Sequence, residues 1–355
     1  MARVVIAGAG AIGASIAYHL VRRGARDVVL ADVGAVASGS TAKAMGGVRQ
    51  QFSTAAEVRL AQESIRFFEE LGPPFFDQVG YLFLATTEAG LATLEERRAL
   101  QATLGVPAER VDAARATGLR VDDVLGAVAC WSDGCADPAA VTRELVRRSA
   151  ELGVELREHT DALGLERDVL VVACGPHSAQ VAARRGVELP VSPLCRQLLA
   201  TGALDLPARL PMIVEAETGF HFRRRGDRLV LAMTDAEARW GFDEVVDESV
   251  FADRLERLAH RYPPAAGTTI DDAWAGLYDM TPDAHPIIGW VADGVYAACG
   301  FSGHGFMQSP AAGEAAAAEL LGDEPPFDLS PYRLERFEGE AVFPETLVLL
   351  SLIHI

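Results

Sequence analysis

The sequence predicts an α/β fold built around a parallel sheet, and three features of the chain support this class. The short β-branched run at residues 3–7 leads directly into a glycine-rich turn and then a helical pattern. Residues 169–173 are apolar at every position, which is typical of a strand buried on both faces of a parallel sheet. Val295–Cys299 predicts a further strand, and a second glycine-rich loop follows it.

The first element is a βαβ unit of about 30 residues. Apolar residues recur at helical spacing after Gly13, and Gly24 ends that pattern. Val28–Ala31 is typical of a second strand, and it closes on Asp32. This order of strand, glycine turn, helix, strand and acid predicts a Rossmann-like unit.

The turn of this unit carries the pattern Gly8-x-Gly10-x-x-Gly13. Such a turn lets the backbone approach a pyrophosphate at a helix N-terminus. Asp32 can accept hydrogen bonds from ribose hydroxyls, and its charge disfavours the 2′-phosphate of NADP. The pattern predicts a bound dinucleotide without distinguishing NAD from FAD, and the alternative is a tight turn that binds nothing. The residues expected to contact it are Gly8, Ala9, Gly10, Ala11, Ile12, Gly13 and Asp32.

Four longer helices and one β-hairpin are predicted in the rest of the chain. Thr54 and Asp137 are suitable N-caps for the first and third of these helices. A hairpin is expected at residues 219–234, where an alternating pattern surrounds an Arg-Arg-Gly-Asp turn. The helices are expected at residues 54–71, 88–104, 138–152 and 310–321, and a further strand at residues 80–86.

The second glycine-rich loop, residues 300–306, follows a predicted strand and precedes a predicted helix. A helix N-terminus of this kind stabilises negative charge that develops on a bound group, such as the N1–C2=O edge of a reduced flavin. An NAD enzyme does not need such a site, so the loop favours FAD. The alternative is a structural turn with a packed His304.

Four blocks of the sequence together resemble a known family. They are residues 8–32, residues 37–41 with 46–52, residues 171–178, and residues 274–305. The last block contains Thr281-Pro282-Asp283 and Gly303-His304-Gly305 and is the most specific of the four. The set resembles the D-amino-acid oxidase superfamily of FAD enzymes, in the branch of sarcosine oxidase β-type subunits, glycine oxidase and FAD-linked proline dehydrogenases.

The resemblance implies a Rossmann-like FAD-binding domain of the glutathione-reductase type with an inserted substrate domain. The inserted domain is expected to be a mostly antiparallel β-sheet. The FAD-binding domain is expected at residues 1–75, 136–185 and 266–337, and the substrate-binding domain at residues 76–135 and 186–265. Residues 338–355 form a tail of uncertain role, which we expect to be a dispensable extension rather than an integral strand.

The resemblance also implies how FAD is held. Ser38, Ser40 and Thr41 are expected along the pyrophosphate and ribitol, with loop capping as the alternative for each. Gly276 stands where some sarcosine oxidases carry the cysteine that bonds the flavin, so FAD is expected to be non-covalent. The other residues expected at FAD are Met45, Gly46, Gly47, Ala162, Ala173, Cys174, Gly175, Gly276, Gly303, His304, Gly305, Phe306 and Met307.

Three residues are candidates for catalysis by the same resemblance. Arg49 is expected to pair with a substrate carboxylate, because a guanidinium can bind a carboxylate through two parallel hydrogen bonds. A surface ion pair is its alternative. Alternation places His221 on the face opposite Phe220 and Phe222, so His221 is expected in the pocket or as a structural histidine. Tyr278 is expected to line the site or to belong to the core.

The implied function is FAD-dependent oxidation of the C–N bond of an amino acid by hydride transfer to flavin N5. A secondary amine such as proline, sarcosine or another N-alkyl amino acid is the expected substrate. The electron acceptor is O2 or another carrier, and Met307 stands where monomeric sarcosine oxidases have a carboxylate-binding lysine. The alternatives are an FAD-dependent 2-hydroxy-acid dehydrogenase and a non-catalytic FAD-binding subunit of a larger complex.

Composition excludes several other classes. The 50 acidic and 32 basic residues give a net charge of -18, which is unsuited to nucleic acid or to anionic membranes. The five cysteines include no C-x-x-C pair, and no metal is expected. Four acidic residues without histidine partners, Asp133, Asp137, Asp271 and Asp272, are predicted to be solvated loop charges. No leader or membrane-length apolar run is found, so we expect a cytoplasmic protein that is a monomer, an oligomer or a subunit of a hetero-complex.

Overall fold

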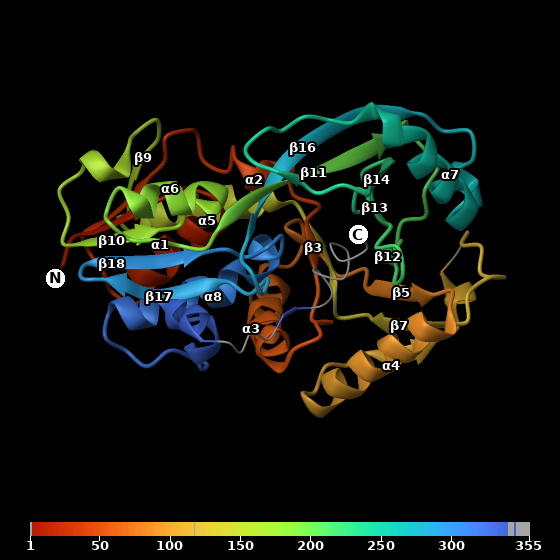
Figure 1. The fold of residues 1–355 in the computed structure, drawn as a ribbon, viewed down its shortest axis with the longest axis horizontal. Coiled ribbons are helices and arrows are strands. Elements are labelled where there is room, and N and C mark those ends of the chain that lie inside the picture. Colours follow the sequence, from red (N-terminus) through yellow and green to blue (C-terminus); the bar gives the residue numbers. More distant parts are fainter. Residues whose placement is uncertain (1, 117, 340–343, 346–355) are drawn as a thin grey trace.

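The structure is a computed structural model that describes residues 2–116, 118–339 and 344–345. Figure 1 shows two lobes side by side, each built on its own β-sheet. The lobe that contains the N-terminus holds a six-stranded sheet, and the other lobe holds a nine-stranded sheet. A three-stranded sheet is formed by β3 (Gly47–Val48), β8 (Gly134–Ala136) and β4 (Phe76–Asp77).

The six-stranded sheet is parallel except at one edge. β1 pairs in parallel with β2 on one side and β10 on the other, and all four residues of β1 and of β2 are buried. β17 pairs antiparallel with β18 at the edge. The parallel sheet predicted from the apolar runs is therefore confirmed. In spatial order its strands are β17 (Ile287–Ala292), β18 (Val295–Cys299), β10 (Val169–Val172), β1 (Val4–Ala7), β2 (Val28–Ala31) and β9 (Glu155–Arg157).

Helices cover this sheet and pack on one another. α1 packs on α5 and α8, and α3 packs on α8. α8 is rich in alanine and packs closely on α1 at Gly313, where a Cβ would lie 2.1 Å from Ser15 Oγ. The helices of this lobe are α1 (Ala11–Arg22), α2 (Ser40–Lys43), α3 (Ala55–Leu71), α5 (Pro138–Glu151), α6 (Ser178–Ala183) and α8 (Gly305–Leu320).

The nine-stranded sheet is mostly antiparallel. β12 and β5 form its one parallel pair among the described residues. β13 and β14 form the predicted hairpin. β16 pairs with β11 along its length, so Ile270–Met280 belongs to this sheet although the sequence placed it in the FAD-binding segment. The strands are β5 (Tyr81–Ala85), β6 (Glu109–Val111), β7 (Gly126–Cys130), β11 (Ser192–Thr201), β12 (Met212–Glu215), β13 (His221–Arg225), β14 (Arg228–Ala232), β15 (Arg239–Trp240) and β16 (Ile270–Met280).

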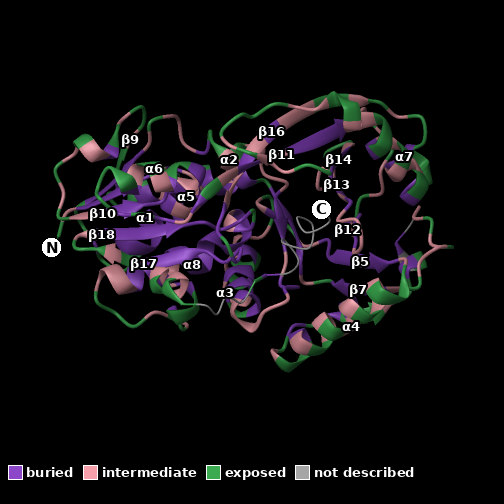
Figure 2. Cartoon of the chain, viewed as in Figure 1, coloured by how far each residue is buried: buried purple, intermediate pink, exposed green. Residues whose placement is uncertain are grey.

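Two further helices belong to this lobe, α4 (Glu88–Thr103) against β5 and β7, and α7 (Phe251–Arg261). Burial follows the two sheets, whose strands are mostly buried, whereas α4 and α7 expose one side (Figure 2). In the described ranges no helix is long and apolar enough to cross a membrane.

The predicted helix starts are confirmed at two caps and wrong at one helix. Thr54 Oγ1 accepts from the Glu57 N–H over 3.3 Å, and Asp137 Oδ1 accepts from the Ala140 N–H over 3.0 Å. α8 begins at Gly305, not at Pro310, which lies inside the helix. Proline lacks the N–H that would bond the Phe306 carbonyl, and the Ser309 hydroxyl donates to that carbonyl instead over 2.9 Å. The helix can therefore continue through the proline.

Candidate active site

A cavity of about 1580 Å³ is lined by residues of both lobes. It extends from the glycine-rich turn after β1 to the hairpin of β13 and β14 and to one face of α4. All three candidate catalytic residues, Arg49, His221 and Tyr278, line it. The structure therefore brings together residues that are more than 200 positions apart in the chain.

The glycine-rich turn fits a ligand at the N-terminus of α1. A Cβ built at Gly13 would lie 1.8 Å from the Gly8 carbonyl oxygen, so only glycine allows this turn. α1 has no side-chain cap at Gly10, which leaves N–H groups of its first turn available to an anion. Of the predicted residues here, Ala9 and Gly13 do not line the cavity. They contribute to the turn itself, Gly13 by its close approach to Gly8 and Ala9 by its hydrogen bond to Asp32.

Asp32 stands at the end of β2 and lines the cavity. One carboxylate oxygen accepts from the Ala9 N–H and the other from the Gly34 N–H, both over 2.7 Å. These two bonds fix the turn and the following loop. A carboxylate has about four acceptor positions, so two remain for hydroxyl groups of a ligand.

Ser38, Ser40 and Thr41 line the cavity and also hold their loop. Ser40 Oγ donates to the Leu277 carbonyl over 2.7 Å, which ties α2 to β16. Thr41 Oγ1 accepts from the Ala11 N–H over 3.1 Å. Loop capping and a place beside the ligand are therefore compatible at these positions. The other predicted cofactor residues that line the cavity are Met45, Gly46, Gly47, Ala162, Ala173, Cys174, Gly175, Gly276, Gly303, His304, Gly305, Phe306 and Met307.

Arg49 is oriented by two protein groups. One terminal nitrogen donates to the Gln51 carbonyl, and the other donates to His304 Nε2 over 3.2 Å. The guanidinium carbon lies 4.2 Å from the centroid of the Phe52 ring. Among the residues that the structure describes, no carboxylate forms an ion pair with Arg49. The side chain is thus a positioned cation that faces the cavity without a neutralising partner, which disfavours the surface ion pair.

His304 is the residue immediately before α8, and its imidazole is buried. Burial, together with the charges of Arg49 and His285, lowers the pKa of His304 well below its usual value. A neutral imidazole that accepts at Nε2 carries its proton on Nδ1. Within the described ranges this buried Nδ1 has no hydrogen-bond partner. A ligand acceptor at the start of α8 would satisfy it.

His221 and Tyr278 lie on strands of the larger sheet. Phe220 and Phe222 pack in its hydrophobic core while His221 lines the cavity, as the alternation predicted. His221 Nδ1 lies 2.8 Å from the Gly219 carbonyl, and burial lowers the pKa of this imidazole. Its Nδ1–H therefore donates to the carbonyl, and Nε2 is left as an acceptor. Burial raises the pKa of the Tyr278 hydroxyl, which stays protonated at neutral pH.

Asp133 corrects one prediction, because it is fully buried rather than a solvated loop charge. One oxygen accepts from the Gln50 N–H over 3.0 Å, and the other accepts from Gln51 Nε2 over 3.1 Å. Burial raises the pKa of Asp133 to about 6. This carboxylate holds the two residues that follow Arg49. The polar pair Gln50-Gln51 beside a candidate residue is the only sequence signal that could have suggested a buried partner.

The other three acidic residues of that prediction differ from Asp133. Asp271 and Asp272 are exposed, and Asp137 caps α5. Within the described ranges, no group of three or more His, Cys, Asp and Glu side chains could hold a metal ion.

Two cavity arginines were missed by the sequence interpretation. Arg97 lines the cavity from α4. Arg196 lines it from β11, with its guanidinium carbon 6.0 Å from the Tyr278 ring centroid and a buried Nη1 that has no hydrogen-bond partner among the described residues. No motif marks either residue in a single sequence.

Comparison with known proteins decides the family. Residues 3–319 match the family described as FAD dependent oxidoreductase (DAO). The chain belongs to the DAO family. It is therefore an FAD-dependent oxidoreductase, as the resemblance in the sequence implied. The glycine turn at α1, and the buried Nδ1 of His304 at α8 that has no partner among the described residues, fit this cofactor at two separate points.

Several DAO-family proteins are similar over nearly the whole chain. Glycine oxidase of Geobacillus kaustophilus is 26% identical over 372 residues, which covers 95% of this chain and 97% of the relative. Mitochondrial sarcosine dehydrogenase of Mus musculus is 25% identical over 95% of this chain, which spans only 41% of that longer protein. The crystal structure of L-proline dehydrogenase from P. horikoshii superimposes with a TM-score of 0.89 at 25% identity, covering 95% of this chain and 97% of that one.

Proposed function

We propose that this DAO-family enzyme oxidises the C–N bond of an amino acid, and that its substrate is a secondary amine such as proline, sarcosine or another N-alkyl amino acid. Relatives whose names include sarcosine dehydrogenase, glycine oxidase and L-proline dehydrogenase support the class. The observation that carries the proposal is Arg49, a cation without an ion-pair partner among the described residues that is held in a fixed orientation inside the cavity. Bound FAD supplies a hydride acceptor for the carbon next to the amine.

Arg49 is proposed to bind the substrate carboxylate. Its guanidinium is oriented by the Gln51 carbonyl and by His304 before any substrate arrives. Such preorganisation reduces the entropy lost on binding and fixes which carbon of the substrate faces the cofactor. An apolar cavity wall beside the clamp, with Phe83 and Met212, suits the substrate side chain.

His221 is proposed to hold the amine. A substrate amine must lose its ammonium proton before it can give up a hydride. His221 has its Nδ1–H engaged by Gly219, so Nε2 is the nitrogen that can accept a hydrogen bond from the neutral amine. The lowered pKa keeps this imidazole neutral and ready to accept. Tyr278, which lines the same cavity, is proposed to shape the site from β16.

The proposal also assigns the cofactor to the predicted residues. The start of α1, where Gly10 provides no side-chain cap, would together with Asp32 hold the diphosphate and ribose end of FAD. The start of α8, with Gly303 and the Nδ1–H of His304, would stabilise negative charge on the reduced cofactor. Helix N-termini favour anions because their first N–H groups are free and their dipole is positive there.

An anaerobic substrate panel tests the function. The FAD-loaded protein is mixed with matched sets such as sarcosine, glycine and glycolate, or N-methylalanine, alanine and lactate in both enantiomers, and flavin absorbance is followed. We expect the N-alkyl amino acids to bleach the flavin fastest. Faster reduction by the hydroxy acids would favour a hydroxy-acid dehydrogenase. Reduction by none of them, with activity gained when a partner protein is added, would favour a non-catalytic subunit.

A further inference from the structure

The cavity has a further arginine on α4, Arg97. Gly90, Thr93 and Arg97 are spaced by three and four residues, so they form one stripe on this helix, and all three line the cavity. Phe83 and Val214 face each other across the paired strands β5 and β12 and line the same cavity. Arg49 lies beside Phe83, with its guanidinium carbon 6.0 Å from the Phe83 ring centroid.

Arg97 has no anionic partner among the residues that the structure describes. Within the described ranges it forms no hydrogen bond and no ion pair. The nearby Glu345 attracts it but lies beyond ion-pair distance, and that carboxylate accepts from the backbone and hydroxyl of Ser53. Burial lowers the pKa of Arg97, and Arg49 lowers it further through charge repulsion. A guanidinium stays charged even so. Two charged arginines, Arg49 and Arg97, therefore destabilise the folded protein unless an anion binds between or beside them.

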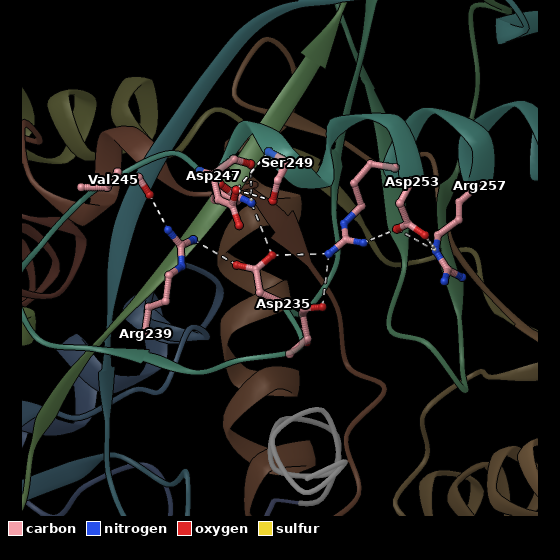
Figure 3. Close-up of polar contacts among 10 residues, drawn as sticks. Asp235, Arg239, Val245, Asp247, Ser249, Asp253 and Arg257 are labelled. Carbon is pink, nitrogen blue, oxygen red and sulfur yellow. Dashed lines mark hydrogen bonds and ion pairs between the residues drawn. The ribbon is translucent and has the colours of Figure 1, made fainter.

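Three other arginines of the cavity and of α4 are already neutralised. Arg254 and Arg257, which line the cavity, contact Asp253, and the neighbouring Asp235 binds Arg239 (Figure 3). On α4, Arg98 contacts Glu95 over 2.9 Å. Arg97 therefore differs from Arg98 on its own helix and from Arg254 and Arg257 in the cavity, whereas Arg49 and Arg196 also lack an ion pair among the described residues.

Resting on the proposed function, we propose that the substrate carries a second carboxylate and that Arg97 binds it while Arg49 binds the first. The substrate class is an N-substituted amino acid with a distal carboxylate, either on the side chain or on the nitrogen substituent. A carboxylate forms charge-assisted hydrogen bonds with a guanidinium and neutralises it. Phe83 and Val214, which line the same cavity, suit the methylene groups that join the two carboxylates. Arg97 is thus a specificity-determining residue.

Matched substrates test this assignment. N-methylglutamate is compared with N-methylglutamine, and N-(3-carboxypropyl)glycine with its terminal amide, in wild type and in the variants Arg97→Gln, Arg97→Lys and Arg98→Gln. In at least one of these two substrate pairs, we expect the kcat/KM of wild type to be at least tenfold higher for the dicarboxylate than for its amide. Arg97→Gln should abolish that preference, Arg97→Lys should keep part of it, and Arg98→Gln should keep all of it.

Binding without turnover separates this proposal from the proposed function. Kd values for succinate, glutarate and adipate, and for their monoamides, are measured by flavin absorbance changes and calorimetry on FAD-loaded protein. Tighter binding of the dicarboxylates that Arg97→Gln removes supports the assignment even if no amine reduces the flavin. Equal affinity for diacid and monoamide in wild type would overturn it. So would a preference that survives in Arg97→Gln, or one that is lost in Arg196→Gln instead.

Discussion

Arg49 donates a hydrogen bond from Nη2 to Nε2 of His304 over 3.2 Å, which joins the predicted substrate clamp to the first turn of α8. The bond requires a neutral His304, and burial lowers the pKa of that imidazole well below its usual value. His304 also packs edge-on against Phe52, with ring centroids 4.9 Å apart. His304 therefore both orients Arg49, the proposed carboxylate clamp, and lies at the start of α8, where the flavin is proposed to bind.

Arg49→Ala should impair catalysis far more than folding. Losing a charge-assisted contact to a carboxylate in an enclosed site should cost about 2–4 kcal/mol, roughly 30- to 1000-fold in kcat/KM. FAD content should stay near that of wild type, since Arg49 is proposed to bind the substrate and not FAD. Steady-state kinetics and flavin absorbance check both parts.

Arg98→Ala is the matched control for that substitution. Arg98 is an arginine whose contact is Glu95 on the same helix, so its loss should change kcat/KM by less than about twofold, as for exposed ion pairs. A change below about threefold for Arg49→Ala would remove the clamp from the proposal.

Sequence patterns predicted the parallel sheet and most helix bounds because those signals are local. Thr54 and Asp137 cap helices through their own neighbours, and hydrophobic periodicity needs no tertiary information. The start of α8 was missed because a proline usually marks a helix start, whereas here Ser309 bonds the carbonyl that Pro310 leaves free. The clamp partner of Arg49 is 255 residues away, and no local pattern carries such a contact.

The burial of Asp133 could not be predicted for a similar reason. It follows Trp131 and Ser132 in a turn, where acidic residues are usually solvated. In the fold it is buried against Gln50 and Gln51, which lie more than 80 residues earlier in the chain. Arg97 is equally hidden, because an arginine on a polar helix is normally a surface residue.

FAD should be released when the protein is denatured. Gly276 provides no side-chain atom, and a Cβ there would lie 2.9 Å from Cβ of Lys43, which fills the space beside it. Acid precipitation of the protein should leave the yellow colour in the supernatant. Colour that stays in the pellet after washing would show a covalent bond at another residue.

Truncation within the tail should have two different outcomes. The expectation of a dispensable tail falls largely on residues 340–343 and 346–355, which lie outside the described residues. Glu345, however, is buried, accepts from Ser53 over 3.1 and 2.5 Å, and donates its N–H to the Asp283 carbonyl. Ending the chain after Phe337 should therefore lower stability by about 1–3 kcal/mol, the usual cost of unsatisfied buried groups.

Ending the chain after Glu345 is the companion experiment. This shorter truncation keeps every contact that the structure describes for Glu345 within the protein, so its Tm should stay near that of wild type. Glu345→Gln, which preserves shape and one acceptor, should fall between the two truncations. Equal Tm values for all four proteins would restore the view that the tail has no role.

Asp133 should make stability depend on pH in a defined direction. Burial raises its pKa from 3.8 to about 6 in the folded protein, so between these values the folded state binds more protons than the unfolded state. Stability from this group is fully present below pH 3.8 and is lost as pH rises through about 6. The loss amounts to about 3 kcal/mol, because each pKa unit corresponds to roughly 1.4 kcal/mol.

The variant Asp133→Asn isolates this effect, since an amide of the same shape does not titrate. The introduced amide would still accept from Gln50 at its oxygen, and Gln51 can turn its own amide to accept from the new NH2 group. The unfolding free energy of wild type minus that of the variant should therefore fall by about 3 kcal/mol between roughly pH 4 and pH 7, measured by urea titration of FAD-saturated protein. Asp137→Asn, which alters a surface helix cap, is the control and should give a difference that changes little over this range. A difference for Asp133→Asn that stays flat, or that rises with pH, would mean that Asp133 is ionised throughout and that its hydrogen bonds from Gln50 and Gln51 outweigh its burial.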